Sequence, residues 1–226
     1  MVNYEVDPAL LAPLVPRGTE LDPWNGRTFV SVVGFRFLDT RVLGVAIPGH
    51  RDFEELNLRF YVRRKSEDGW RRGVVFVKEI VPRRAIAWVA RVLYNENYVA
   101  AAMHEVRREP NGGPSVRSAA YEWFHANRWN RVSVECPGAP YVPADDSEET
   151  FITEHYWGYA RQRNGGTVEY QVEHPRWDVL RGSSASFDCD VAPLYGPQFA
   201  PFLSAPPTSA FVAIGSAVRV RGGLRL

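Results

Sequence analysis

Cysteine is nearly absent from the chain, which contains only Cys136 and Cys189, more than fifty residues apart. Two free thiols in a reducing compartment are the expectation for such a chain, although a single disulfide between them stays open. The five histidines are scattered, and neither a C-x-x-C nor an H-x-x-x-H spacing occurs. The sequence therefore predicts no zinc site and no other bound metal.

An excess of charge of one sign is also missing, because 27 basic residues face 26 acidic ones and the net charge is +1. A nucleic-acid-binding protein usually gathers a basic excess on one face, so we expect no nucleic-acid partner. No apolar run approaches the roughly 18 residues of a membrane span, and no basic segment introduces a signal peptide at the N-terminus. A cytoplasmic protein without a membrane partner is expected.

The familiar catalytic and cofactor-binding motifs are absent as well. The chain has no G-x-S-x-G elbow, no Walker loop and no G-x-G-x-x-G after a strand, so we expect no cofactor. Its 226 residues, of which 45% are hydrophobic and 23% charged, are typical of a globular protein. Because no shift in composition marks a linker, we expect one domain over residues 1–226.

Alternating and β-branched patterns predominate, so the predicted fold is α+β and mainly β. Asp7 and Pro8 provide the cap and first turn of an opening helix. The other helices are expected over residues 83–95 and 145–155. Strands are expected over 27–37, 53–64, 69–81 and 210–220, with hairpin turns at "PNGGP" (110–114) and "RNGG" (163–166), whereas the proline-rich stretch 191–209 reads as an ordered loop.

The stretch "FEELNLRFYVRR" (53–64) has two distinct faces, because Glu55, Asn57, Arg59 and Tyr61 alternate with apolar residues. On an open antiparallel sheet the polar face would simply meet water. However, the neighbouring strand 69–81 is largely apolar on both faces, as expected of a strand that is covered on both sides. The polar face is then enclosed, and its charges must pair with each other, with Lys78 or Glu79, or with a bound polar molecule. A small barrel around a polar cavity meets these conditions.

Five segments carry a resemblance that spans most of the chain: "VDPALLAPLVPRGTELD", "FEELNLRFYVR", "VPRRAIAWVARVLYNENY", "SEETFITEHYWGY" and "VEHPRW". In this order they resemble the motifs of the family called domain of unknown function 2071, within the acetoacetate-decarboxylase-like superfamily. The resemblance implies a bifurcated sheet or cone-shaped barrel around a central cavity, with a few peripheral helices. It also implies a change of chemistry, because the two positions of the decarboxylase lysine pair fall on Tyr98 and Val99. Neither residue forms an imine.

Several candidate site residues have alternative interpretations. Arg59 either binds a substrate carboxylate or neutralises Glu55. Lys78 either provides an acidified amine or lies in a salt bridge or at the barrel rim. His174 either serves acid–base chemistry at the cavity mouth, which it covers together with Trp177, or bonds a turn while Trp177 packs on the barrel. Glu154 and His155 are adjacent, so only one of them points inward. The predicted catalytic residues are Glu55, Lys78 and His174, and the predicted substrate-binding residues are Asn57, Arg59, Tyr61, Tyr98 and Trp177.

These residues predict a polar cavity that binds a small carboxylate or carbonyl compound, in a lyase-like enzyme that does not use the usual imine lysine. The alternative is a non-catalytic module that binds a small molecule in the same place. A purely structural role would follow if Glu55 and Arg59 satisfied each other. Assembly with further copies of the chain stays open.

Overall fold

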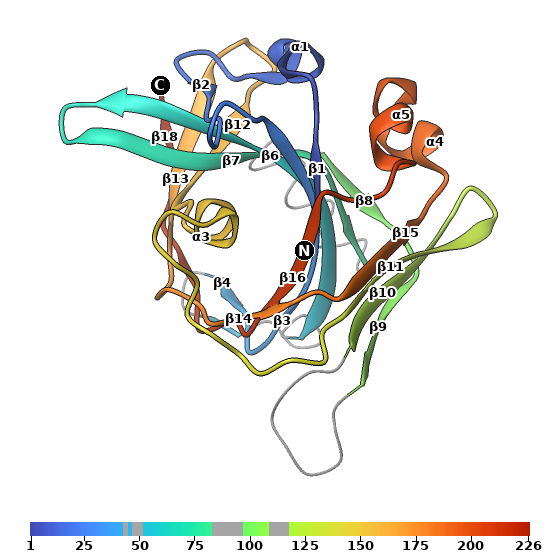
Figure 1. The fold of residues 1–226 in the computed structure, drawn as a ribbon. Helices are drawn as coiled ribbons and strands as arrows, with labels where there is room; N and C mark the ends of the chain where they lie inside the picture. Colours follow the sequence, from blue (N-terminus) through green and yellow to red (C-terminus); the bar gives the residue numbers. More distant parts are fainter. Residues whose placement is uncertain (43–44, 47–51, 83–96, 109–117) are drawn as a thin grey trace.

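The computed structural model describes residues 1–42, 45–46, 52–82, 97–108 and 118–226. Strands predominate, and the short helices lie at the periphery or against one face of the largest sheet (Figure 1). The strands are β1 (Val2–Glu5), β2 (Glu20–Leu21), β3 (Phe29–Phe37), β4 (Arg41–Val42), β5 (Val45–Ala46), β6 (Phe53–Ser66), β7 (Gly69–Val81), β8 (Tyr98–Ala100), β9 (Met103–Arg108), β10 (Ser118–His125), β11 (Arg128–Glu135), β12 (Trp157–Arg161), β13 (Thr167–Glu173), β14 (Val179–Arg181), β15 (Ser184–Asp188), β16 (Ser209–Ala213), β17 (Arg219–Val220) and β18 (Leu224–Arg225). The helices are α1 (Pro8–Leu11), η1 (Ala12–Leu14), α3 (Glu148–Thr153), α4 (Val191–Tyr195), η2 (Pro197–Phe199) and α5 (Ala200–Leu203).

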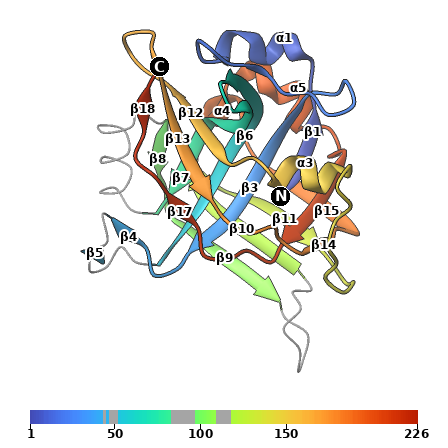
Figure 2. The same cartoon turned by 90° about the vertical axis from the view of Figure 1, so that its left-hand side faces the viewer.

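The largest sheet is mixed, and its main path runs in the order β14-β16-β1-β3-β6-β7-β12-β13-β17. It curls around α3, while a four-stranded sheet in the order β15-β11-β10-β9 lies beside it at the lower right of Figure 1 and behind it in Figure 2. The predicted fold class is thus confirmed. The predicted closure is wrong, because no described strand joins β14 to β17 and the sheet is not closed into a barrel. Among the described residues, no helix combines the length and apolar character that a membrane crossing requires.

The hairpin of β6 and β7 forms the centre of the large sheet, as the sequence predicts. Its apolar side chains Leu56, Leu58 and Phe60 are completely buried, and they pack with Tyr121 and Trp123 of the small sheet in the main core. The polar side of β6 is covered as well, since the exposed fraction of Glu55, Asn57 and Tyr61 is 3%, 1% and 1%. The predicted enclosure of this face is therefore confirmed.

A β-bulge at Val77 changes which side chains of β7 reach the polar side. Arg59 pairs with Phe76 and Leu58 pairs with Lys78, so Val77 is an extra residue on β7. Beyond the bulge, Glu79 pairs with Asn57 and shares its face, whereas Lys78 lies on the face of Leu58. Simple alternation along 69–81 would have placed Phe76 and Lys78 on the same face.

Most of the other local predictions are confirmed where the structure describes them. The side chain of Asp7 accepts a hydrogen bond of 2.8 Å from the Ala9 amide, and "RNGG" connects β12 to β13. The predicted loop at 191–209 is wrong, because α4, η2 and α5 occupy it and bury their apolar residues in the main core. The predicted strand 210–220 is too long, since β16 ends at Ala213. The predicted helix 83–95 and the turn 110–114 lie outside the described residues.

Two smaller features complete the fold. No disulfide joins Cys136 and Cys189. Gly34 on β3 lies directly under the Tyr121 ring, and a methyl group added there would come within 2.3 Å of Tyr121 Cδ2. The two sheets can approach each other at this point because Gly34 has no side chain.

We predict that Gly34→Ala lowers the free energy of unfolding by about 1–3 kcal/mol, because the added methyl group overpacks the contact between the sheets. Equilibrium urea unfolding measures this change. Gly138→Ala is the matched control, since nothing lies within 4 Å of an added methyl group there. Equal stability of the two variants would show that the sheets do not pack closely at Gly34.

Candidate functional site

Two groups of polar side chains lie on the enclosed side of β6, one at each end of the polar face that runs from Glu55 to Tyr61. The first group, here called the Glu55 cluster, consists of Glu55, Asn57, Glu79 and Tyr98. Glu55 accepts hydrogen bonds from Asn57 Nδ2 at 3.3 Å and from the Tyr98 hydroxyl at 3.2 Å. Tyr98 is brought there by β8, which pairs in parallel with β7 and sets Tyr98 beside Glu79.

Burial dominates the ionisation of the Glu55 cluster. It raises the pKa of Glu55 to about 7, even though the hydrogen bonds from Asn57 and Tyr98 act in the opposite direction. Burial and the nearby carboxyl groups of Glu55 and Glu79 hold the pKa of Tyr98 well above its ordinary value. At neutral pH, Glu55 is thus poised between its protonated and ionised forms, while Tyr98 is a hydrogen-bond donor.

The predicted catalytic Lys78 does not lie with the Glu55 cluster. It projects from the opposite face of the sheet, where its Nζ donates a hydrogen bond of 3.2 Å to Asn97 Oδ1. The bulge at Val77 causes this difference, since it turns Glu79 and not Lys78 toward Asn57. Lys78 therefore shares the face of Leu58 and does not lie on the polar face with Glu55.

Arg59 and Tyr61 occupy the other end of the polar face, against α3. One terminal nitrogen of Arg59 donates to the Ile152 carbonyl at 3.1 Å, and its guanidinium carbon lies 5.6 Å from the centre of the Tyr61 ring. Arg59 Nε is buried and has no hydrogen-bond partner among the described residues. The Tyr61 hydroxyl is already engaged, because it lies 2.6 Å from Ser31 Oγ, which in turn donates to Asn3.

An ionic group lies next to this end of the face and consists of the buried Asp22 and His155 and the partly exposed Arg72. Asp22 Oδ2 lies 2.6 Å from Arg72 Nε and 3.2 Å from His155 Nε2. Burial raises the pKa of Asp22, but the hydrogen bonds from His155 and Arg72 outweigh it and the pKa lies below its ordinary value. Burial lowers the pKa of His155 to about 4, so this histidine is neutral at pH 7.

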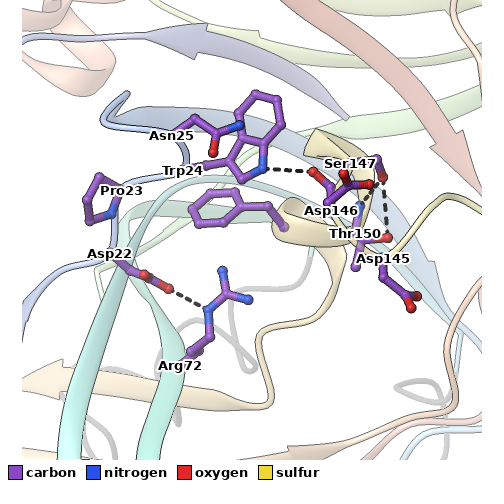
Figure 3. A pocket seen from close by; sticks show the side chains of 10 residues that line it. Asp22, Pro23, Trp24, Asn25, Arg72, Asp145, Asp146, Ser147 and Thr150 are labelled. Atoms are coloured by element: carbon purple, nitrogen blue, oxygen red, sulfur yellow. Dashed lines mark hydrogen bonds and ion pairs between the residues drawn. The ribbon is translucent and has the colours of Figure 1, made fainter.

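A surface pocket of about 370 Å³ opens beside the ionic group. Trp24 lies on one side of it and Arg72 on the opposite side, with the Arg72 guanidinium pointing inward (Figure 3). Asp22 and Phe151 also line the pocket, and both contact His155 behind its wall. The side chains of Asp22 and Phe151 therefore lie between the pocket and His155.

The predicted residues His174 and Trp177 lie elsewhere, on the surface after β13. Their rings stack at 4.0 Å, and the His174 ring also contacts Tyr156. His174 Nδ1 lies 2.9 Å from the Pro175 carbonyl, and the indole of Trp177 donates to Ser216. These contacts match the interpretation in which His174 bonds a turn, since no described contact joins it to Glu55 or Arg59.

Sequence reasoning missed Asp22 and Arg72 and left His155 undecided between two orientations. The structure turns His155 inward, while Glu154 accepts a hydrogen bond from the hydroxyl of Tyr156, two residues along the chain. Asp22 has no pattern around it that could have identified it, because it reaches the site from a loop after β2. Among the described residues, no group of histidine, cysteine and acidic side chains could hold a metal ion.

We predict that Glu55→Gln removes a pH dependence of stability. The pKa of Glu55 is about 7 in the folded protein against an ordinary value of 4.5, so the folded state binds the proton more tightly. The free energy of unfolding of the wild type therefore falls as the pH rises through this interval. The variant resembles protonated Glu55, so its free energy of unfolding should exceed that of the wild type by up to about 3 kcal/mol above pH 7. The two values should match near pH 4.5. Urea unfolding between these pH values measures the difference.

The control for this prediction is Glu20→Gln, which changes a carboxylate in a surface ion pair with Arg63. It should leave the pH dependence of unfolding unchanged. A Glu55→Gln profile parallel to that of the wild type would show that Glu55 titrates normally.

Comparison with known proteins identifies relatives of this chain by sequence. The family profile described as an uncharacterised conserved protein, domain of unknown function 2071, matches residues 1–217. The chain is also 32% identical over 189 residues to the uncharacterised protein YqjF of Bacillus subtilis, a match that covers 81% of this chain and 72% of YqjF.

Solved structures with the same fold come from acetoacetate-decarboxylase-like proteins. The enduracididine biosynthesis enzyme MppR in complex with pyruvate superposes with a TM-score of 0.67 at 15% identity, covering 99% of this chain and 86% of MppR. The acetoacetate decarboxylase of Legionella pneumophila superposes with a TM-score of 0.66 at 14% identity, covering 100% of this chain and 82% of the decarboxylase. An acetoacetate-decarboxylase-like enzyme from Sphingomonas wittichii gives a TM-score of 0.66 at 15% identity, with 100% and 89% coverage. With this architecture and a sequence match over nearly its whole length, the chain belongs to the uncharacterised family called domain of unknown function 2071.

Proposed function

We propose that the enclosed polar face of β6 binds a small organic molecule that carries a carboxylate or a carbonyl group. Arg59 would hold the carboxylate, and the Glu55 cluster would hold the carbonyl. The observation that carries this proposal is the buried Glu55, which is hydrogen-bonded by Tyr98 and Asn57, on the same strand face as a buried Arg59 Nε that has no partner among the described residues. Such unfilled, water-excluded polar groups are typical of ligand sites.

The charges at the two ends favour one orientation of the ligand. Glu55 and Glu79 are both buried, so a carboxylate placed between them would be repelled. A carbonyl oxygen there can accept a hydrogen bond from the Tyr98 hydroxyl or from protonated Glu55. The carboxylate belongs at Arg59, whose guanidinium suits it. The backbone separation of Glu55 and Arg59 along β6 is about 13 Å, and their side chains reduce the space that the ligand must span.

A lyase-like reaction would rest on Glu55, whose pKa of about 7 suits proton transfer at neutral pH. The fold shared with a decarboxylase and with an enzyme that binds pyruvate supports a substrate with a carboxylate and a carbonyl group. The reaction would proceed without an imine, because Tyr98 stands where the resemblance places the decarboxylase lysine. Asn57 would orient the ligand between the two ends.

A non-catalytic module that binds the same molecule is the second candidate. It is favoured by one observation, namely that Lys78 lies on the other face of the sheet and thus provides no replacement for the missing lysine. The two candidates share the ligand site and differ only in turnover.

A thermal-shift screen with pyruvate, acetoacetate and short fatty acids tests the proposed site. A ligand at 100 times its dissociation constant should stabilise the protein by about 2.7 kcal/mol. Arg59→Met should abolish this stabilisation, and Arg59→Lys should weaken it, because lysine keeps the charge but loses the bidentate geometry.

Arg128→Met serves as the control, since Arg128 pairs with Asp188 on the small sheet. It should leave the shift unchanged. Loss of acetoacetate, followed in the same samples, distinguishes an enzyme from a binding module. A screen without any stabilising acid would contradict the site.

A further inference from the structure

His155 is the one buried histidine on the enclosed side of the large sheet among the described residues. It follows α3 closely, and its ring packs 4.7 Å from the Tyr61 ring and 5.1 Å from the Phe151 ring. These aromatic contacts and the 5% exposed fraction hold the imidazole in one place. Its polar atoms must therefore be satisfied locally.

Asp22 determines which nitrogen of His155 carries the proton. The carboxylate lies 3.2 Å from Nε2 and also accepts from Arg72 Nε at 2.6 Å. An ionised carboxylate only accepts hydrogen bonds, so Nε2 is the protonated nitrogen. Burial and the nearby charges of Arg72 and Arg59 lower the pKa of His155, while Asp22 raises it, and the ring is neutral at pH 7. In that tautomer Nδ1 carries a lone pair and can only accept.

Two buried polar atoms at this end of the face are left unfilled among the residues that the structure describes. They are His155 Nδ1, an acceptor, and Arg59 Nε, a donor. Both side chains lie against the Tyr61 ring, since the Arg59 guanidinium carbon is 5.6 Å from its centre. A buried acceptor and a buried donor at the same aromatic ring are complementary to a molecule that offers a hydroxyl next to a carboxylate.

We propose that His155 accepts a hydrogen bond through Nδ1 from the hydroxyl group of a small 2-hydroxy acid whose carboxylate is bound by Arg59. This inference rests on the proposed function, because it uses the same Arg59 anchor, and it names the ligand class. A 2-keto acid would instead direct a carbonyl lone pair at the Nδ1 lone pair. Any carbonyl group of the ligand then belongs at the far end, next to the Glu55 cluster.

The surface pocket beside the ionic group provides a route to this position. Asp22 and Phe151 line the pocket on one side and contact His155 on the other. The Arg72 guanidinium points into the pocket, where it can attract an incoming carboxylate before Arg59 binds it (Figure 3).

Dissociation constants for lactate, propionate and pyruvate, measured by calorimetry on the full chain at pH 7.5, test this inference. We expect lactate to bind about fivefold more tightly than propionate, because one additional hydrogen bond is made, and more tightly than pyruvate. His155→Phe keeps the aromatic contacts and should reduce lactate binding to the level of propionate without changing propionate binding. His174→Phe, which alters a surface histidine, should leave all three constants unchanged.

The tautomer can be followed in the unmodified protein, which keeps the test decisive if His155→Phe does not fold. In ¹⁵N-histidine-labelled wild type, lactate should shift the Nδ1 resonance of His155 and propionate should not. Equal binding of lactate and propionate would overturn the role of His155 and leave the Arg59 site intact. Failure of all three acids to bind would overturn the proposed function together with this inference.

Discussion

On the inner side of the curled sheet, polar side chains are removed from water, and the rest of this structure depends on that constraint. The strand β6 is covered on both faces, and one of them carries a carboxylate, an amide, a guanidinium and a phenol. Each buried polar group must find a partner or change its ionisation, because an isolated buried charge costs several kcal/mol. The arrangement of α3, β8 and the loop that carries Asp22 follows from this requirement.

The two ends of the polar face meet the requirement differently. At one end burial raises the pKa of Glu55 to about 7, so a carboxyl group that is easily protonated lies beside a phenol. At the other end, Asp22 and Arg72 keep their charges and pair with each other, and the neutral His155 also contacts Asp22. The face thus presents an acidic region with a phenol donor at Glu55 and a cationic region at Arg59. This asymmetry would give the molecule that we propose to bind here a single orientation.

The sequence was sufficient for the fold class, the central hairpin and the enclosure of the polar face, because each depends on local alternation and turn chemistry. The helices of 191–209 were missed because five prolines obscure helical periodicity, although proline is tolerated in a first helical turn. The Glu55 cluster could be predicted in part, since Glu55 and Asn57 share one strand. Asp22 and Arg72 could not, because their contacts with His155 join segments far apart in the sequence.

The bulge at Val77 makes the composition of the interior sensitive to a single residue. With a regular ladder continued from the pair Arg59–Phe76, Lys78 would lie opposite Asn57, and Glu79 would move to the face of Leu58. An amine would then replace a carboxyl group beside Glu55. One inserted or deleted residue at this point of the strand is therefore enough to convert an acidic lining into a basic one without altering the architecture. Related chains with the same architecture can acquire different chemistry by this route.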